Sequence, residues 1–185
     1  MTYLNVIDLD NTLIPYDTSR NYIISRIKSG DFIFFLFTIL RKLRILGRSR
    51  FSQIIYESVN RCDKNFLDRF IKFQIINIDS AILNKVKEHS PSGQKIINVL
   101  CSASPSIFVI PIAESLGYIG IGSGFINGNY MHMYGNQKKI TINKRFPVHE
   151  YDYNFAISDC ISDINLLLCF KDYCLYKRQN IISEE

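Results

Sequence analysis

Two aspartates directly behind an apolar segment are the residues best placed to do chemistry. Asp8 and Asp10 follow residues 3–7, a run that only Asn5 interrupts and that predicts a buried strand. Alternate residues of a strand share a face, so this spacing directs both carboxylates to one point. Two anions that close repel unless a cation or a shared proton lies between them. Because Mg²⁺ binds carboxylate and phosphate oxygens together, we expect a magnesium site; a strand followed by an Asp/Asn turn is the alternative.

A second apolar segment, residues 95–101, predicts a buried parallel strand that ends in Ser102. A helix is expected to begin near Ser104 or Pro105, because proline suits the first helical turn. A hydroxyl at a strand end, beside the free N–H groups of a helix start, can hold phosphate. Ser102 is therefore a candidate phosphate ligand, and Ser104 is interpreted as the cap of the helix.

Charged pairs follow in the last third of the chain. Lys138 and Lys139 stand at the expected start of a helix, and a pair of surface lysines is the plain interpretation. Asp159 and Asp163 follow a predicted strand, residues 153–157. Acidic residues that favour a helix N-terminus are the alternative for this second pair.

Together these residues resemble the four motifs of the haloacid dehalogenase-like phosphohydrolase superfamily. Asp8-x-Asp10-x-Thr12 behind a hydrophobic strand is similar to the first motif. The other three motifs are matched, in chain order, by Ser102, by Lys138 and by the Asp159/Asp163 pair. The fourth motif commonly begins with glycine, and this chain has Ser158 there. The order of the motifs is similar to that of the subgroup IB enzymes, such as phosphoserine phosphatases, which carry a helical C1-type cap.

The resemblance implies a role for each residue. Asp8 would attack phosphorus and become an aspartyl phosphate, and Asp10 would be the general acid and base. A lysine at position 138, or 139 as the second choice, would neutralise the nucleophile and the phosphate. Mg²⁺ would be held by Asp8, Asp159 and the backbone carbonyl of Asp10. Ser102, Lys138 and Thr12 would bind the phosphate, and Thr12 would also orient the Asp10 region. Asp163 would be a supporting residue that binds the metal through water or orients Lys138.

The expected fold is α/β, a Rossmann-like parallel sheet flanked by helices. Helices are predicted at residues 17–28, 32–40, 50–62, 63–76 and 79–88, so a long helical stretch separates the first two strands. This is too long for a plain crossover. The resemblance implies a core domain of residues 1–15 and 80–185 and a helical cap domain of residues 16–79 that closes over the site. A turn at 89–93, strands at 118–123, 130–133 and 173–177, and a helix at 163–170 complete the prediction.

Residues 32–40 form a run of apolar side chains that only Thr38 interrupts, followed by several arginines and a lysine. The run is too short to span a bilayer, which needs ~20 residues. Three interpretations remain open. They are a buried helix of a small bundle, a segment (residues 32–50) that associates weakly with a membrane surface, and a partner-binding or self-association helix. The aromatic stripe Phe66, Phe70 and Phe73 is interpreted as core.

The composition is that of a globular protein: 185 residues, 47% hydrophobic and 21% charged, with a net charge of +5. This modest positive charge is interpreted as a solvated basic face, and no nucleic-acid partner is expected. The five cysteines have no CxxC spacing and are interpreted as reduced thiols, and the three histidines are scattered, so neither a disulfide framework nor a zinc site is predicted. With no secretory signal at the N-terminus, a cytoplasmic location is expected. The residue usage suggests a bacterial genome of low GC content.

The expected function is Mg²⁺-dependent hydrolysis of a small phosphorylated metabolite, because the resemblance ties an acid at position 10 to phosphatases and not to dehalogenases. Three alternatives remain open. They are a lipid- or sugar-phosphate phosphatase of envelope polysaccharide assembly, a phosphotransferase that passes the phosphoryl group to a sugar, and a catalytically silent binding module. The sequence does not specify the substrate or the oligomeric state.

Overall fold

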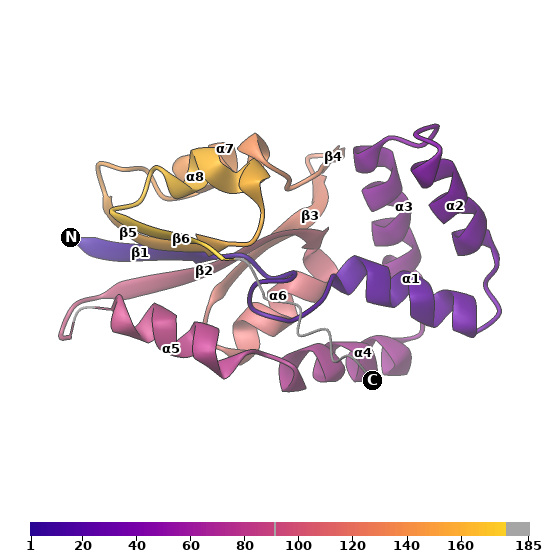
Figure 1. Cartoon of the computed structure of the whole chain (residues 1–185), viewed down its shortest axis with the longest axis horizontal. Helices are drawn as coiled ribbons and strands as arrows, with labels where there is room; N and C mark the ends of the chain where they lie inside the picture. Colours follow the sequence, from indigo (N-terminus) through magenta and orange to yellow (C-terminus); the bar gives the residue numbers. More distant parts are fainter. Residues whose placement is uncertain (91, 177–185) are drawn as a thin grey trace, which may run out of the picture.

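A computed structural model describes residues 1–90 and 92–176. Its centre is a six-stranded sheet in the order β4-β3-β2-β1-β5-β6, with β1 in the middle and only β4 antiparallel to its neighbour (Figure 1). This confirms the predicted α/β class and its mainly parallel sheet. The strands are β1 (Thr2–Ile7), β2 (Ile96–Pro105), β3 (Ile119–Ile126), β4 (Asn129–Met131), β5 (Tyr151–Ser158) and β6 (Asp172–Leu175).

The sheet is sandwiched between helices because both faces of β1 are apolar. Leu4 and Val6 pack with the helices α7 (Asn136–Arg145) and α8 (Ile164–Leu167), which lie above the sheet in Figure 1. Ile7 packs on the opposite side with α5 (Ser80–Glu88) and α6 (Ser106–Ser115). A strand buried on both faces is typical of a parallel sheet.

The five helices predicted between the first two strands are all present. They are α1 (Thr18–Lys28), α2 (Ile33–Lys42), α3 (Arg48–Asn60), α4 (Lys64–Ile76) and α5. Asp17, Asp63 and Asp79 cap the helices that follow them, each accepting a hydrogen bond from a backbone N–H group in the first turn. In Figure 1, α1, α2 and α3 lie beyond one end of the sheet, α5 lies below the strands, and α4 lies below α1, where it packs against α6. The division into a core and a cap domain remains a prediction.

An aromatic cluster joins these helices to the sheet layer. The Tyr22 ring is fully buried and contacts the rings of Phe66, Phe70 and Phe108. Its hydroxyl is hydrogen-bonded to Ser58 of α3 at 2.8 Å. The core interpretation of the aromatic stripe is therefore confirmed for Phe66 and Phe70. It is wrong for Phe73, which is 52% exposed.

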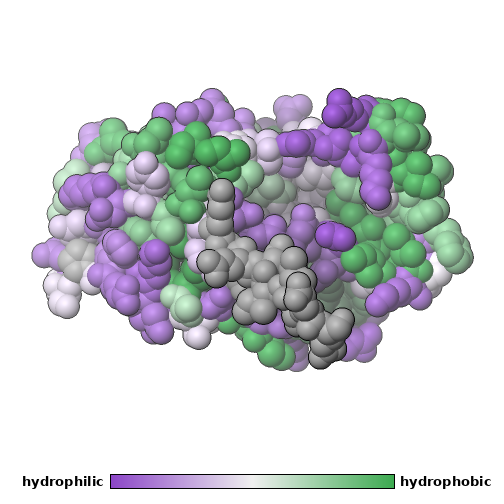
Figure 2. Space-filling model, in the orientation of Figure 1, coloured by the Kyte–Doolittle hydropathy of each residue, from purple (hydrophilic) through white to green (hydrophobic). Residues whose placement is uncertain are grey.

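The interpretation of residues 32–40 as a buried helix is wrong for most of its side chains. Within α2 only Phe34 is buried. Phe32 is 73% exposed, and Phe35 and Leu36 are both more than half exposed. Figure 2 shows this apolar surface at the right-hand end of the molecule, where Figure 1 draws α2. Among the described residues, no helix combines the length and apolar character needed to cross a membrane.

Close packing of α6 against β3 fixes the backbone around Ser104. A Cβ atom on Gly122 would lie 2.7 Å from Ser106 Cα and 2.8 Å from the Ser104 carbonyl oxygen, so only glycine fits here. The helix begins at Ser106, with Pro105 at the cap position and no side-chain cap. The interpretation of Ser104 as the helix cap is therefore wrong, because strand β2 extends to Pro105 and keeps that serine within the sheet.

Element boundaries near the C-terminus differ modestly from the prediction. The helix expected at residues 163–170 is a short 3₁₀ turn, Ile161–Asp163, followed by α8. The strand expected at 173–177 is β6, and Lys177 lies outside the described residues, as does Pro91 of the predicted turn. The strands expected at 118–123 and 130–133 are β3 and β4, which form a hairpin with its turn at Asn127 and Gly128.

Candidate active site

A tight loop at the end of β1 places the two aspartates of the first motif. Asp8 is the first residue past the strand, and its N–H donates to the Ile157 carbonyl of β5. The chain then turns back on itself through Asn11, whose φ of 55° is positive, a conformation that asparagine tolerates better than most residues. Strand geometry therefore ends before Asp10, and the two carboxylates have different hydrogen-bonding partners.

A buried lysine holds the Asp8 carboxylate. Lys138 Nζ lies 2.8 Å from Asp8 Oδ1 and 2.6 Å from Asp163 Oδ2. These three side chains are between 2% and 8% exposed, so the cluster is almost completely removed from water. Lys138 reaches it from the first turn of α7, which Gly135 opens with a φ of 56°. The neighbouring Lys139 is half-buried and does not join this cluster, so the geometry selects Lys138.

Ser158 is a member of this cluster that the sequence did not identify as a site residue. Its hydroxyl donates to Asp163 Oδ2 at 2.8 Å and lies 3.3 Å from Asp8 Oδ2. The only signal in the sequence was a serine where the family commonly has glycine. The side chain adds a hydrogen-bond donor between two carboxylates, which offsets part of their repulsion.

Three donors surround the Asp10 carboxylate. The N–H of Thr18 donates to Oδ1 at 2.7 Å, while Ser102 and Ser104 donate to Oδ2 at 2.9 and 2.7 Å. Ser102 is fully buried inside β2 and bonds Asp10, not Asp8, so its hydroxyl is already engaged with protein. Ser104 was missed as a site residue, because its position before Pro105 suggested a cap. Ser104 is also 3.1 Å from Ser19 of α1, which links the helices beyond the sheet to Asp10.

Thr12 connects the first motif to the fourth. Its fully buried hydroxyl accepts a hydrogen bond from the Asp159 N–H at 2.9 Å. This contact places Asp159 at the end of β5, beside the loop that carries Asp8. A phosphate-binding role for Thr12 remains a prediction, and the structure places its side chain between the two loops.

Burial dominates the electrostatics of the cluster. It raises the pKa of Asp8 from 3.8 to about 7, although the adjacent Lys138 acts in the opposite direction. Burial alone would lower the pKa of Lys138, but the charges of Asp8 and Asp163 outweigh it and raise that pKa. Lys138 is therefore charged at neutral pH, whereas Asp8 is poised between its two protonation states.

The carboxyl groups of Asp8 and Asp159 suit a divalent cation. Burial raises the pKa of Asp159, whereas a side-chain hydrogen bond with Asp8 lowers it. Two carboxyl groups that share a hydrogen bond must share a proton, and a hard cation can replace that proton. No cluster of three or more His, Cys, Asp or Glu side chains suited to a metal occurs in residues 1–90 and 92–176. The side chains that could hold a cation here are thus the two carboxylates of Asp8 and Asp159.

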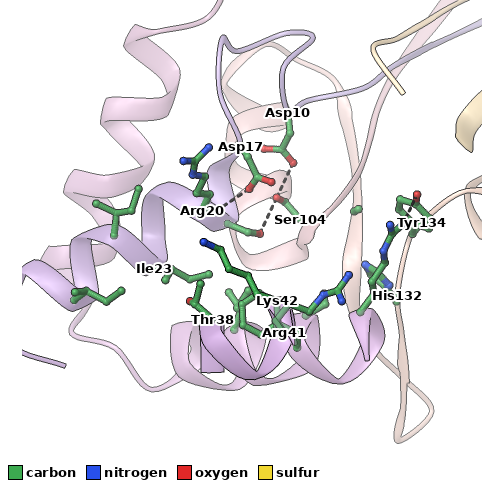
Figure 3. A pocket seen from close by; sticks show the side chains of 18 residues that line it. Asp10, Asp17, Arg20, Ile23, Thr38, Arg41, Lys42, Ser104, His132 and Tyr134 are labelled. Atoms are coloured by element: carbon green, nitrogen blue, oxygen red, sulfur yellow. Dashed lines mark hydrogen bonds between the residues drawn. The ribbon is translucent and has the colours of Figure 1, made fainter. Parts of the chain in front are cut away.

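A cavity of about 590 Å³ extends from Asp10 and Ser104 towards α2 (Figure 3). Residues of α1, α2 and α3 form much of its wall, and His132 and Tyr134 close another side. Asp8 does not line the cavity, so Asp10 is the predicted catalytic residue that faces it. The site thus has two compartments, a buried ionic cluster around Asp8 and an open cavity that begins at Asp10.

Acidic loops at the ends of two adjacent parallel strands, with a buried lysine between them, define a Rossmann-like α/β protein with a polar site at the carboxyl ends of its strands. The family profile described as haloacid dehalogenase-like hydrolase matches residues 6–168. The chain belongs to this family, which confirms the predicted family and the predicted enzyme class, a hydrolase.

Solved structures share this fold at low sequence identity. A protein of unknown function from Bordetella pertussis Tohama I has a TM-score of 0.70 and 16% identity, with 94% of this chain and 89% of that chain covered. A haloacid dehalogenase family hydrolase from Salmonella enterica serovar Typhi has a TM-score of 0.60 and 15% identity, covering 90% and 60%. A phosphoserine phosphatase, determined as a phospho-aspartyl intermediate analogue, has a TM-score of 0.53 and 14% identity, covering 95% and 94%. No curated protein matches the sequence closely enough to be identified as a relative.

Proposed function

We propose that the protein is a Mg²⁺-dependent phosphomonoester hydrolase that works through a phosphorylated Asp8. The observation that carries this proposal is the pairing of Asp8 with the buried Lys138, next to a second carboxylate, Asp10, that faces a cavity. The phosphoserine phosphatase with a similar fold was captured as an analogue of its phospho-aspartyl intermediate, and this supports the same chemistry here. The substrate is a small phosphorylated compound that enters through the cavity.

Each residue then has a defined task. An oxygen of Asp8 attacks phosphorus while the bond from phosphorus to the leaving alcohol oxygen breaks. Lys138 stays charged throughout and offsets the negative charge that builds up on the phosphoryl oxygens. Protonated Asp10 gives its proton to the leaving oxygen, then as a carboxylate takes a proton from the water that attacks the aspartyl phosphate. Free phosphate leaves and Asp8 is restored.

Asp8 and Asp159 would hold the magnesium ion together with the Asp10 carbonyl. When bound, it would neutralise charge on the phosphate and on the two carboxylates. Thr12 supports this arrangement by fixing the backbone of Asp159. Asp163 keeps Lys138 aimed at Asp8, because it accepts a hydrogen bond from the same ammonium group.

Phosphate release from an aryl phosphate, with Mg²⁺ or with EDTA, tests this proposal. Wild type is expected to turn over only with Mg²⁺, and Asp8→Asn is expected to lose turnover because an amide cannot attack phosphorus. Asp152→Asn is a matched control, since Asp152 pairs with Lys171 on the protein surface. Equal rates in wild type and Asp8→Asn would refute the nucleophile. Product analysis separates hydrolysis, which releases inorganic phosphate, from transfer to a sugar, which does not.

We also propose that the protein associates weakly with a membrane surface through residues 32–50. The predicted cytoplasmic location remains a proposal as well. The exposed apolar side chains of α2 support the membrane association, and the exposed Arg44 next to them would face anionic headgroups. An enzyme held in this way could act on a lipid-linked phosphate. Vesicles with and without anionic lipid test this by co-sedimentation, and Phe35→Ser/Leu36→Ser is expected to abolish binding. Failure of wild type to sediment with anionic vesicles would refute it.

A further inference from the structure

Four basic side chains line the cavity: Arg20 of α1, Arg41 and Lys42 of α2, and Arg48 at the start of α3. Arg20 lies beside Asp17, whereas Arg41 and Lys42 lie on the helix that forms the other wall (Figure 3). Within residues 1–90 and 92–176, none of these four side chains forms an ion pair with a carboxylate. Arg48 is instead held by Tyr134, through a hydrogen bond of 2.6 Å to its hydroxyl and a cation–π contact with its ring. A group of unpaired cations around a cavity attracts an anion.

The sequence around these residues carries no compensating acid. Between Asp31 and Glu57 there is no acidic residue, while five basic residues occur at positions 41, 42, 44, 48 and 50. These five equal the net charge of +5 of the whole chain, so the rest of the protein is neutral overall. The excess positive charge of the molecule is therefore concentrated in residues 41–50, and three of these five basic side chains line the cavity.

Acidic and neutral groups mark the other parts of the cavity. Asp10 and Asp17 lie together at the catalytic end (Figure 3). His132 faces Arg48, and both its burial and that positive charge lower its pKa, so it is neutral at pH 7. Apolar side chains of α1 and α3 lie along the wall, among them Ile23, Ile27 and Ile55. A ligand that fits this surface has an apolar part as well as charge.

We infer that the cavity binds the far end of the substrate through a second anionic group, held by Arg41, Lys42 and Arg48. The substrate class is thus a phosphomonoester whose apolar spacer carries a second phosphate or a carboxylate. This inference rests on the proposed function for the reaction itself, but the anion subsite can be tested separately. Because several cations share one anion, the second group should improve binding about tenfold or more at low salt.

Two matched probes test this inference: hexyl phosphate and the hexanediyl bisphosphate that has a phosphate at both ends of the same chain. Isothermal titration with the Asp8→Asn variant measures binding without turnover. The bisphosphate is expected to bind about tenfold more tightly, and added salt should reduce the difference. Arg41→Gln/Lys42→Gln should remove most of this preference, whereas Lys144→Gln, an exposed lysine of α7 on the other side of the sheet, should retain it.

Phosphate release from the same probes by the wild type distinguishes the two proposals. A higher kcat/KM for the bisphosphate, lost in Arg41→Gln/Lys42→Gln, would support both. Equal affinities and equal kcat/KM values for the two probes would overturn the anion subsite and leave the phosphatase intact. Preferential binding of the bisphosphate without any phosphate release would keep the subsite and refute the proposed reaction. Should the double variant fail to fold, judged by its thermal unfolding, Arg48→Gln, a change at an exposed residue, takes its place with the same expected direction.

Discussion

Replacing Lys138 by methionine is expected to disable the site because it removes the only positive charge that the described residues place against Asp8. The ammonium group lies 2.8 Å from Asp8 Oδ1 and 2.6 Å from Asp163 Oδ2, and all three side chains are nearly inaccessible. Removing one partner of a buried ion pair costs about 3–5 kcal/mol when the other stays charged. Two carboxylates lose their partner here, so protonation of one of them is the cheaper response.

That protonation falls on the proposed nucleophile. The pKa of Asp8 is already raised to about 7, and Lys138 is the main influence that lowers it. Without the lysine this pKa rises above 7, so Asp8 is mostly protonated at neutral pH and unable to attack. The loss of the positive charge near the phosphoryl group adds to this effect, and one such group is worth roughly 10²–10³ in rate. We expect turnover to fall by about 10³ and stability by at most about 3 kcal/mol.

Urea denaturation and phosphate release, measured on the same preparations, check this prediction. Lys139→Met is the matched control, since it changes the adjacent lysine of the same helix turn, which does not join the cluster. Adding Asp163→Asn to Lys138→Met should recover part of the stability and none of the activity, because it removes the second uncompensated carboxylate. The reasoning would be refuted if Lys139→Met lost as much activity as Lys138→Met.

Two further predictions concern Asp10 and the pH dependence of folding. Ser104→Ala should lower kcat about tenfold with little change in KM, because Asp10 Oδ2 then keeps only the hydrogen bond from Ser102. Ser115→Ala is the control, since its hydroxyl is bonded to a backbone carbonyl at the end of α6, and it should have no effect in the same steady-state assay. In EDTA, stability should fall as pH rises from about 4 to about 7, by at most about 4 kcal/mol, because folded Asp8 keeps its proton over this range and unfolded Asp8 does not. Denaturation curves at several pH values should show a weaker decline in Asp8→Asn, and equal slopes would contradict this explanation.

The sequence predicted the distant contacts of the site better than the local ones. The N–H of Asp159, behind β5, meets the hydroxyl of Thr12, behind β1, across 147 positions of the chain. This could be anticipated because β1 and β5 are adjacent parallel strands, whose ends meet at one edge of the sheet. A residue that follows either strand is brought to that edge whatever the length of the connection. The resemblance to the family then indicated which polar residues belong to the site at this edge of the sheet.

Side-chain direction within a few residues was not predictable in this way. Ser102 and Ser104 both turn to Asp10, as alternate residues of one strand do, because β2 continues to Pro105 and does not end at Cys101. Where β2 ends depends on how α6 packs against Gly122, which no pattern of apolar residues records. Hydrogen bonds of this kind depend on backbone detail, whereas strand order depends on burial.

The exposed side of α2 was mispredicted for a different physical reason. An apolar run indicates that side chains avoid water but not which surface covers them, and the bundle of α1, α2 and α3 covers only Phe34 fully. The inward side of the same helix carries Arg41 and Lys42 into the cavity, the reverse of a usual amphipathic helix. Under the two proposals, the charge that faces inward would bind the substrate and the apolar surface that faces outward would bind the membrane. The bisphosphate and vesicle experiments test these two sides independently, since Phe35→Ser/Leu36→Ser leaves every cationic side chain of the cavity in place.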